Sequence, residues 1–189
     1  MAVERFDART WPGEVLEELF ADAFPAFIVA DPEAKKYIDR VREWFADLNI
    51  MLVDDHDVPV ATGWGVPVSW NGEQAPAASC TRVIAPVRPT LKPAHPLTQI
   101  DTFAGWTRDD GAPLDPWLRT HWRLGGQIIA TAPRSQTMTG TVREWEGWTG
   151  MVFPSTGEYV IPRGLSILHI DRDEDRGRYV EPNVWVRHR

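Results

Sequence analysis

Cysteine is almost absent from this sequence, since Cys80 is the only one among 189 residues. A single cysteine excludes a disulfide within the chain, which predicts a cytoplasmic protein because structural disulfides are rare there. No basic cluster interrupts the net charge of −7, so we expect no nucleic-acid partner. The longest apolar stretches are far shorter than a membrane span, and no apolar core follows residues 1–5 as in a secretory signal. We therefore expect no membrane partner either.

Tryptophan and proline are in excess, with ten and sixteen residues respectively. The chain length predicts a single domain, 1–189, which is long enough to bury a core. Tryptophan buries a large area while keeping an N–H group that needs a partner. Two interpretations of this tryptophan-rich composition remain open. The rings either fill the core, or they line a pocket for a small organic ligand.

The first half of the chain, 1–72, predicts two helices and a β-hairpin. One helix spans 13–24, and Asp31 and Pro32 supply the cap and first residue of a second. Residues 49–53 and 58–64 alternate as a hairpin does, and a strand is expected to continue from Ala61 to Trp70.

The second half, 81–189, predicts strands mixed with two helices. Asp115 and Pro116 start a helix that Gly125 ends, and Thr141 starts another with the spacing of a capping box. The strands are expected at 81–87, 127–131, 158–161, 166–170 and 178–186, with Pro133 ending the second of them. The acidic turns 54–57 and 171–177 are expected to be solvated, so we expect no metal site.

The segment Trp117–Ile129 has the order helix, Leu-Gly, strand, and it resembles the C-terminal part of the GNAT acyltransferase superfamily. Segments 84–92, 132–135, 144–150 and 179–185 are similar to an actinobacterial GNAT-like subgroup of acetyltransferases. The resemblance implies an α/β (α+β) fold. We expect a truncated GNAT-like mixed sheet, mostly antiparallel, with helices on both faces.

Residues 71–80 contain no Arg/Gln-x-x-Gly-x-Gly/Ala turn, the motif with which this family holds the acyl-CoA pyrophosphate. Such a turn works because backbone N–H groups at a helix N-terminus attract anions. We therefore expect no cofactor. Acetyl-CoA or CoA would bind only if Arg88, Lys92 or Arg134 supplied the charge. In this family a central strand leads into that turn, and the resemblance implies that this strand is missing as well. Its loss would leave a sheet edge through which a homodimer could form.

Two residues are the catalytic candidates. His121 stands four positions before Gly125, where the resemblance places a general-acid tyrosine, and a histidine can act as acid or base. Glu181 would have a raised pKa and could act as a base if it is buried. The alternatives are a packing role for His121 and an exposed edge position for Glu181. The substrate-binding candidates are Trp64, Arg88, Lys92, Trp117, Trp122, Arg134, Asn183 and Trp185.

Three functions follow from these observations. The first is a small-molecule enzyme on a repurposed GNAT-like scaffold, working without CoA through acid/base chemistry in a Trp-lined pocket. The second is an acyl-CoA-dependent N-acyltransferase that binds CoA in an atypical way. The third is a non-catalytic protein that binds a ligand or a partner.

Overall fold

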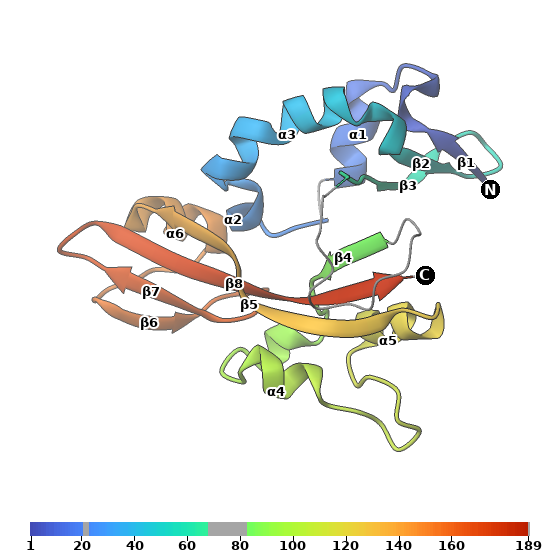
Figure 1. The fold of residues 1–189 in the computed structure, drawn as a ribbon. Coiled ribbons are helices and arrows are strands. Elements are labelled where there is room, and N and C mark those ends of the chain that lie inside the picture. Colours follow the sequence, from blue (N-terminus) through green and yellow to red (C-terminus); the bar gives the residue numbers. More distant parts are fainter. Residues whose placement is uncertain (21–22, 68–82, 189) are drawn as a thin grey trace. The chain divides into compact units, whose positions relative to one another are not determined.

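The computed structural model describes residues 1–20, 23–67 and 83–188 (Figure 1). Contacts divide the chain into two compact units, Met1–Asn71 and Gly72–Arg189. This division falls close to the expected boundary between the halves 1–72 and 81–189, while the single domain stays a prediction. All strand pairings in the described residues are antiparallel, and helices accompany both sheets, which confirms the expected mixed fold class.

The first unit has a three-stranded sheet in the order β1-β2-β3, formed by β1 (Ala2–Arg5), β2 (Ile50–Val53) and β3 (Pro59–Gly63). The helices are α1 (Gly13–Phe20), α2 (Ala26–Val29) and α3 (Pro32–Trp44), with short 3-10 turns at Phe6–Ala8 and Ala46–Leu48. Trp11, Met51 and Val53 form its core.

Local signals set most of these elements. Asp31 accepts a hydrogen bond from Glu33 N at 2.8 Å, and Pro32 takes the first position of α3, as expected. The hairpin of β2 and β3 is also confirmed. The expected strand from Ala61 to Trp70 is wrong in extent, because β3 ends at Gly63. Residues 68–82, which include Trp70, Thr81 and the expected gap 71–80, lie outside the described residues.

The second unit is built around two long strands, β5 (Gln127–Gly140) and β8 (Arg176–His188), which pair along most of their length (Figure 1). On its other edge, β8 pairs with β4 (Val83–Val87) near its C-terminal end and with β7 (Ile167–Asp171) near its start. The strand β6 (Gly157–Val160) follows β7.

Three helices cover this sheet. The helices α4 (Ile100–Ala104) and α5 (Pro116–Arg123) lie on one side of the long strands, and α6 (Val142–Thr149) lies towards the hairpin end of β8 (Figure 1). A 3-10 turn occupies Lys92–Ala94. The core under α4 and α5 consists of Val87, Ile100, Phe103, Leu118, Val184 and Val186.

The expected end of a strand at Pro133 is wrong. β5 continues to Gly140, and its register against β8 shifts between Ala132 and Gln136. A proline has no N–H to donate to a neighbouring strand, but a bulge does not require one. Pro133 therefore lies in a bulge inside the strand rather than at its end.

Candidate functional site

Glu181 is buried, with 2% of its surface exposed, and it is the centre of a polar network. Arg88 Nε donates to Glu181 Oε1 at 2.5 Å, and the hydroxyl of Tyr179 donates to Glu181 Oε2. Burial raises the pKa of Glu181, an effect that the Arg88 guanidinium and the Tyr179 hydroxyl oppose. Burial also raises the pKa of Tyr179, reinforced by the neighbouring Glu181 carboxylate.

Lys92 lies in the same region and is 1% exposed. Its ammonium donates to three backbone carbonyls, Leu165 O at 2.6 Å, His95 O at 2.8 Å and Pro96 O at 3.4 Å. Burial lowers the pKa of Lys92, while the Glu181 carboxylate opposes that shift. Its three protons all have acceptors within the protein. In this arrangement Lys92 ties the turn after β4 to the loop before β7.

His121 is placed by the capped helix α5. Asp115 accepts from Trp117 N and Leu118 N, both at 2.9 Å, which fixes the first turn. In the last turn, His121 Nδ1 lies 2.8 Å from His188 Nε2 on β8. The Trp117 ring meets His121 edge-on, with 4.8 Å between ring centroids. Burial, and then the neighbouring His188, lower the pKa of His121.

The structure groups the expected site residues in separate places. Arg88, Lys92 and Glu181 come together in one network, and Trp117 joins His121 at the end of α5. Glu181 and the His188 partner of His121 are seven residues apart on β8, or ~23 Å along the strand. The two catalytic candidates therefore do not meet at one reacting atom.

The remaining candidates lie elsewhere. Arg134 is exposed in the β5 bulge, where Asn183 Nδ2 donates to Ser135 Oγ at 2.9 Å. Trp122 is 49% exposed on α5, and Trp185 is half-buried on β8. Trp64 belongs to the first unit and is 60% exposed. As substrate-binding residues these five side chains, Trp64, Trp122, Arg134, Asn183 and Trp185, stay predictions.

The tryptophans divide between core and surface, and the pocket-lining interpretation stays a prediction. Trp145 is 0% exposed and Trp11 is 8% exposed, so these two rings fill cores. Trp64, Trp117 and Trp122 instead present large surfaces to solvent.

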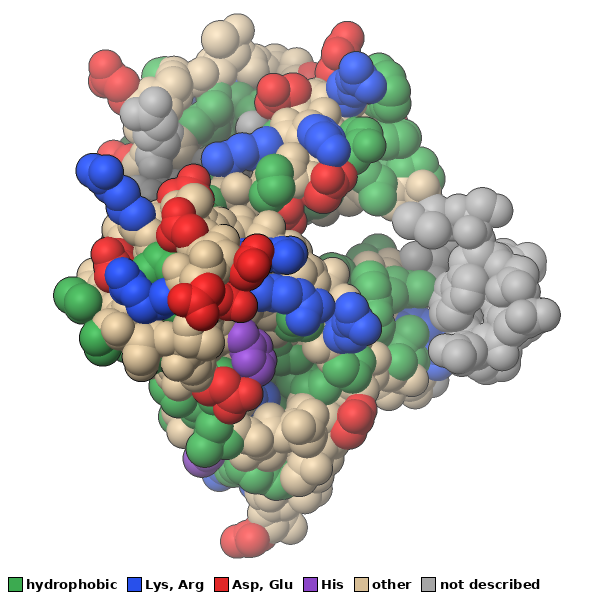
Figure 2. All heavy atoms as spheres, turned by 90° about the vertical axis from the view of Figure 1, so that its left-hand side faces the viewer, with side chains coloured by type: hydrophobic (Ala, Val, Ile, Leu, Met, Phe, Trp, Pro, Cys, Tyr) green, Lys and Arg blue, Asp and Glu red, His purple; other side chains and the backbone are tan. Residues whose placement is uncertain are grey.

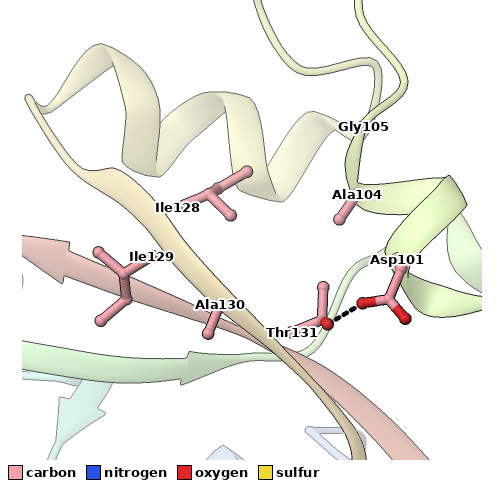
Figure 3. A pocket seen from close by; sticks show the side chains of 7 residues that line it. All are labelled: Asp101, Ala104, Gly105, Ile128, Ile129, Ala130 and Thr131. Atoms are coloured by element: carbon pink, nitrogen blue, oxygen red, sulfur yellow. Dashed lines mark hydrogen bonds between the residues drawn. The ribbon is translucent and has the colours of Figure 1, made fainter. Parts of the chain in front are cut away.

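A shallow cavity of about 430 Å³ lies between α4 and β5 (Figure 3). Asp101, Ala104 and Gly105 form one wall, and residues 128–131 form the other. The hydroxyl of Thr131 donates to Asp101 across it. No tryptophan is among these lining residues. Sequence reasoning missed this cavity because its walls are 23 or more residues apart along the chain and contain no recognisable motif.

The surface charge, possible metal ligands and possible membrane-spanning helices bear on the remaining expectations. Basic and acidic side chains lie interspersed on the face shown in Figure 2. Within residues 1–20, 23–67 and 83–188, no three histidine, cysteine or carboxylate side chains gather as metal ligands would. No helix in the described part of the chain is long and apolar enough to cross a membrane.

Comparison with known proteins gives one informative relative. The arginine N-acetyltransferase avaD of Aspergillus versicolor is 35% identical over 124 residues, covering 56% of this chain and 43% of the relative. The chain thus spans less than half the length of that relative. No family model matches the chain, and no solved structure matches it. The expected likeness to an acetyltransferase is confirmed at this level, while the GNAT-like subgroup and the missing loop stay predictions.

Proposed function

We propose that this chain is a GNAT-like N-acyltransferase that moves an acyl group from acyl-CoA to an amine, and that arginine is the first acceptor to test. The observation that supports the proposal is the 35% identity with an arginine N-acetyltransferase over 124 residues. The mixed antiparallel fold agrees with it. Arginine is named from the relative, so a lysine or another cationic amine is an equally direct test of the acceptor class.

His121 is the group that suits proton transfer in this reaction. An amine that attacks a thioester carbon must lose a proton, and the departing thiolate must gain one. His121 is half-buried, and its pKa is lowered, which keeps the ring neutral and able to accept a proton near neutral pH. Its Nδ1 is occupied by His188, so Nε2 is the atom left for the substrate.

A turnover assay tests the proposal. The full chain is incubated with acetyl-CoA and arginine, and release of the CoA thiol is followed against a reaction without acceptor. We expect acceptor-dependent release that His121→Phe reduces by 10²-fold or more, the usual contribution of a general acid or base. His169→Phe is the matched control, because His169 is exposed on β7 and pairs with Glu158. Acceptor-independent release in every sample would count against the proposal.

A second candidate is acid/base chemistry without CoA on the same scaffold. The observation that favours it is that two of the side chains expected to bind the CoA phosphates already form hydrogen bonds within the protein. Arg88 is bonded to Glu181 and to Arg163 O, and Lys92 is bonded to three carbonyls. Neither side chain is therefore free to replace the amides of a pyrophosphate turn. Of the three cations expected to bind CoA, only the exposed Arg134 has no such bonds among those described above.

Thermal unfolding with and without CoA separates the two candidates. A ligand at 100 times its Kd stabilises a folded protein by about 2.7 kcal/mol, which is readily seen as a higher Tm. The acyltransferase proposal predicts a rise in Tm with sub-millimolar CoA or acetyl-CoA. An unchanged Tm at millimolar CoA would favour the second candidate.

A further inference from the structure

Two histidines from distant parts of the sequence meet where α5 ends beside β8. His121 Nδ1 lies 2.8 Å from His188 Nε2, and the ring planes are inclined by 50°. We propose that His121 and His188 share one proton, and that His188 is a positioning residue that sets whether His121 Nε2 is a base or an acid. The use of this pair in acyl transfer rests on the proposed function, whereas the pairing itself does not.

The distance fixes the number of protons between the rings. A hydrogen bond between two imidazole nitrogens contains a single proton, because two N–H groups would repel and two bare nitrogens have nothing to share. If His121 Nδ1 holds that proton, the neutral His121 ring has a bare Nε2 that can accept. If His188 Nε2 holds it, His121 Nε2 carries a hydrogen and can donate. The two roles exchange when the shared proton crosses the hydrogen bond while His121 Nε2 takes up a proton from the amine or from solvent and His188 Nδ1 releases one to solvent, so that both rings stay neutral.

The backbone holds the rings in this geometry. Gly126 N donates to His121 O at 2.8 Å at the end of α5. A Cβ at Gly126 would lie 2.9 Å from His188 Cε1 and 2.7 Å from His121 O, so a side chain there would force the two elements apart. The Trp117 ring covers another side of His121 at 4.8 Å. Packing on two elements, α5 and β8, thus holds the pair.

The charged groups around the two histidines favour one positive charge on the pair over two. On α5, Arg119 is bonded to Pro113 O and Leu114 O, and Arg123 lies in the last turn. On β8, Arg187 Nη2 donates to Gln127 Oε1 at 2.6 Å. The β4 strand and residues 127–131 of β5 contain no titratable side chain. Among the described residues no carboxylate forms an ion pair with either ring, so nothing there would compensate a second positive charge.

The experiment is a pH titration by NMR of the full chain labelled with ¹⁵N-histidine. Two-bond correlations report the proton on each ring nitrogen, and the single variants His121→Phe and His188→Phe assign the signals. In His188→Phe we expect the titration midpoint of His121 to rise by about half a pH unit or more, because a neighbouring positive charge is removed. His169→Phe is the control and leaves the His121 signals unchanged. An unchanged His121 titration in His188→Phe would overturn the pairing.

His188→Gln is a second variant, which keeps the proposal testable if His188→Phe does not fold. The amide oxygen can accept from His121 Nδ1–H, so we expect His121 to be held with its proton on Nδ1 and Nε2 bare. The nitrogen shifts would then differ from those of wild type. Identical His121 shifts in wild type and His188→Gln would mean that the proton stays on His121 Nδ1, and they would overturn the exchange between the acid and base roles.

The positioning role has a separate kinetic test. If the wild type transfers acetyl groups, we expect His188→Phe to lower kcat about 10-fold or more, with KM within twofold and the acid limb of the pH profile displaced upwards. An unchanged kcat and pH profile would leave the pair a packing feature and overturn its positioning role. Absence of turnover in wild type would sink the proposed function, and the NMR titration would still decide the pairing.

Discussion

A buried ammonium links two segments of the second unit. Lys92 is 1% exposed, and its donors reach Leu165 O at 2.6 Å and His95 O at 2.8 Å. The backbone N–H of Leu165 in turn donates to the Tyr179 hydroxyl at 2.7 Å. A buried carbonyl that loses its hydrogen-bond donor lowers the free energy of unfolding by about 1–3 kcal/mol. Lys92 therefore contributes to stability mainly through the carbonyls that its removal would leave unpaired.

Replacement of this lysine tests that role. Lys92→Met keeps the apolar stem and removes the ammonium, and we expect it to lower the free energy of unfolding by roughly 2–4 kcal/mol. Lys36→Met is the matched control, because Lys36 pairs with Glu33 on the surface and its loss should cost less than about 0.5 kcal/mol. Urea unfolding measures both. Equal effects of the two variants would mean that the carbonyl contacts contribute little.

Glu181 gives a prediction about pH. Its pKa is raised by burial, so its contribution to stability is present below the unfolded value and is lost as the pH rises through the folded pKa. Glu181→Gln does not titrate. We therefore expect the stability of wild type relative to Glu181→Gln to fall in urea titrations as the pH rises above about 4.3, the ordinary pKa of a glutamate. A relative gain over that range would show that attraction to Arg88 outweighs the cost of burial.

At the residue scale, the sequence predicts residue types better than their partners. It singled out Arg88, Lys92 and Glu181, and these three do meet. The acceptors of Lys92 could not be predicted, because Leu165 is 73 positions away and contributes only a backbone oxygen. His188 was missed for a related reason. Nothing in a terminal Val-Arg-His-Arg sequence indicates a partner 67 positions earlier.

At the element scale, signals within a single turn were read correctly. Asp31, Asp115 and Thr141 cap α3, α5 and α6 as their spacing predicts, because a cap involves neighbours in the sequence. The sequence does not predict the extent of β5, because pairing with β8 decides whether Pro133 ends the strand or lies in a bulge. The five-residue α4 was also missed, since it is too short to show a helical period.

Two glycines test the packing of α6 on β8. A Cβ at Gly177 would lie 2.1 Å from Trp145 Cδ1, so we expect Gly177→Ala to destabilise the fold by about 1–3 kcal/mol. Gly147 lies inside α6 with open space around it, and Gly147→Ala should stabilise by about 0.5–1 kcal/mol. Thermal unfolding compares the two. Opposite signs are the prediction, and destabilisation by both would contradict it.

The outer edge of β4 bears on the expected homodimer. β4 pairs with β8 along one edge, and no other described strand pairs with it. Val83 on this strand is 62% exposed. Unpaired strand edges favour association with another chain, so a dimer through β4 stays our prediction.

Light scattering measures this association. We expect a mass near twice 21.4 kDa for the wild type and a shift towards monomer in Val83→Lys. Val29→Lys is a matched control, because Val29 is equally exposed at 61% but belongs to α2 of the first unit. A wild-type monomer at working concentration would contradict the prediction.

At the scale of the whole molecule, each compact unit has its own core, and the arginine N-acetyltransferase avaD is more than twice as long as the part that it shares with this chain. The likeness to an arginine N-acetyltransferase and the antiparallel fold support acyl transfer. The bonded states of Arg88 and Lys92 support a departure from ordinary CoA binding. Detection of acetyl transfer would decide between an acyltransferase and an enzyme that works without CoA.

The most direct measurement is transfer of an isotopically labelled acetyl group from acetyl-CoA to arginine, followed by mass spectrometry of the amino acid. We predict labelled N-acetylarginine that accumulates with time and with enzyme concentration, at a rate that falls by 10²-fold or more in His121→Phe and is unchanged in His169→Phe. Absence of a labelled product from arginine, lysine and other amines, together with a Tm that CoA does not raise, would contradict the account.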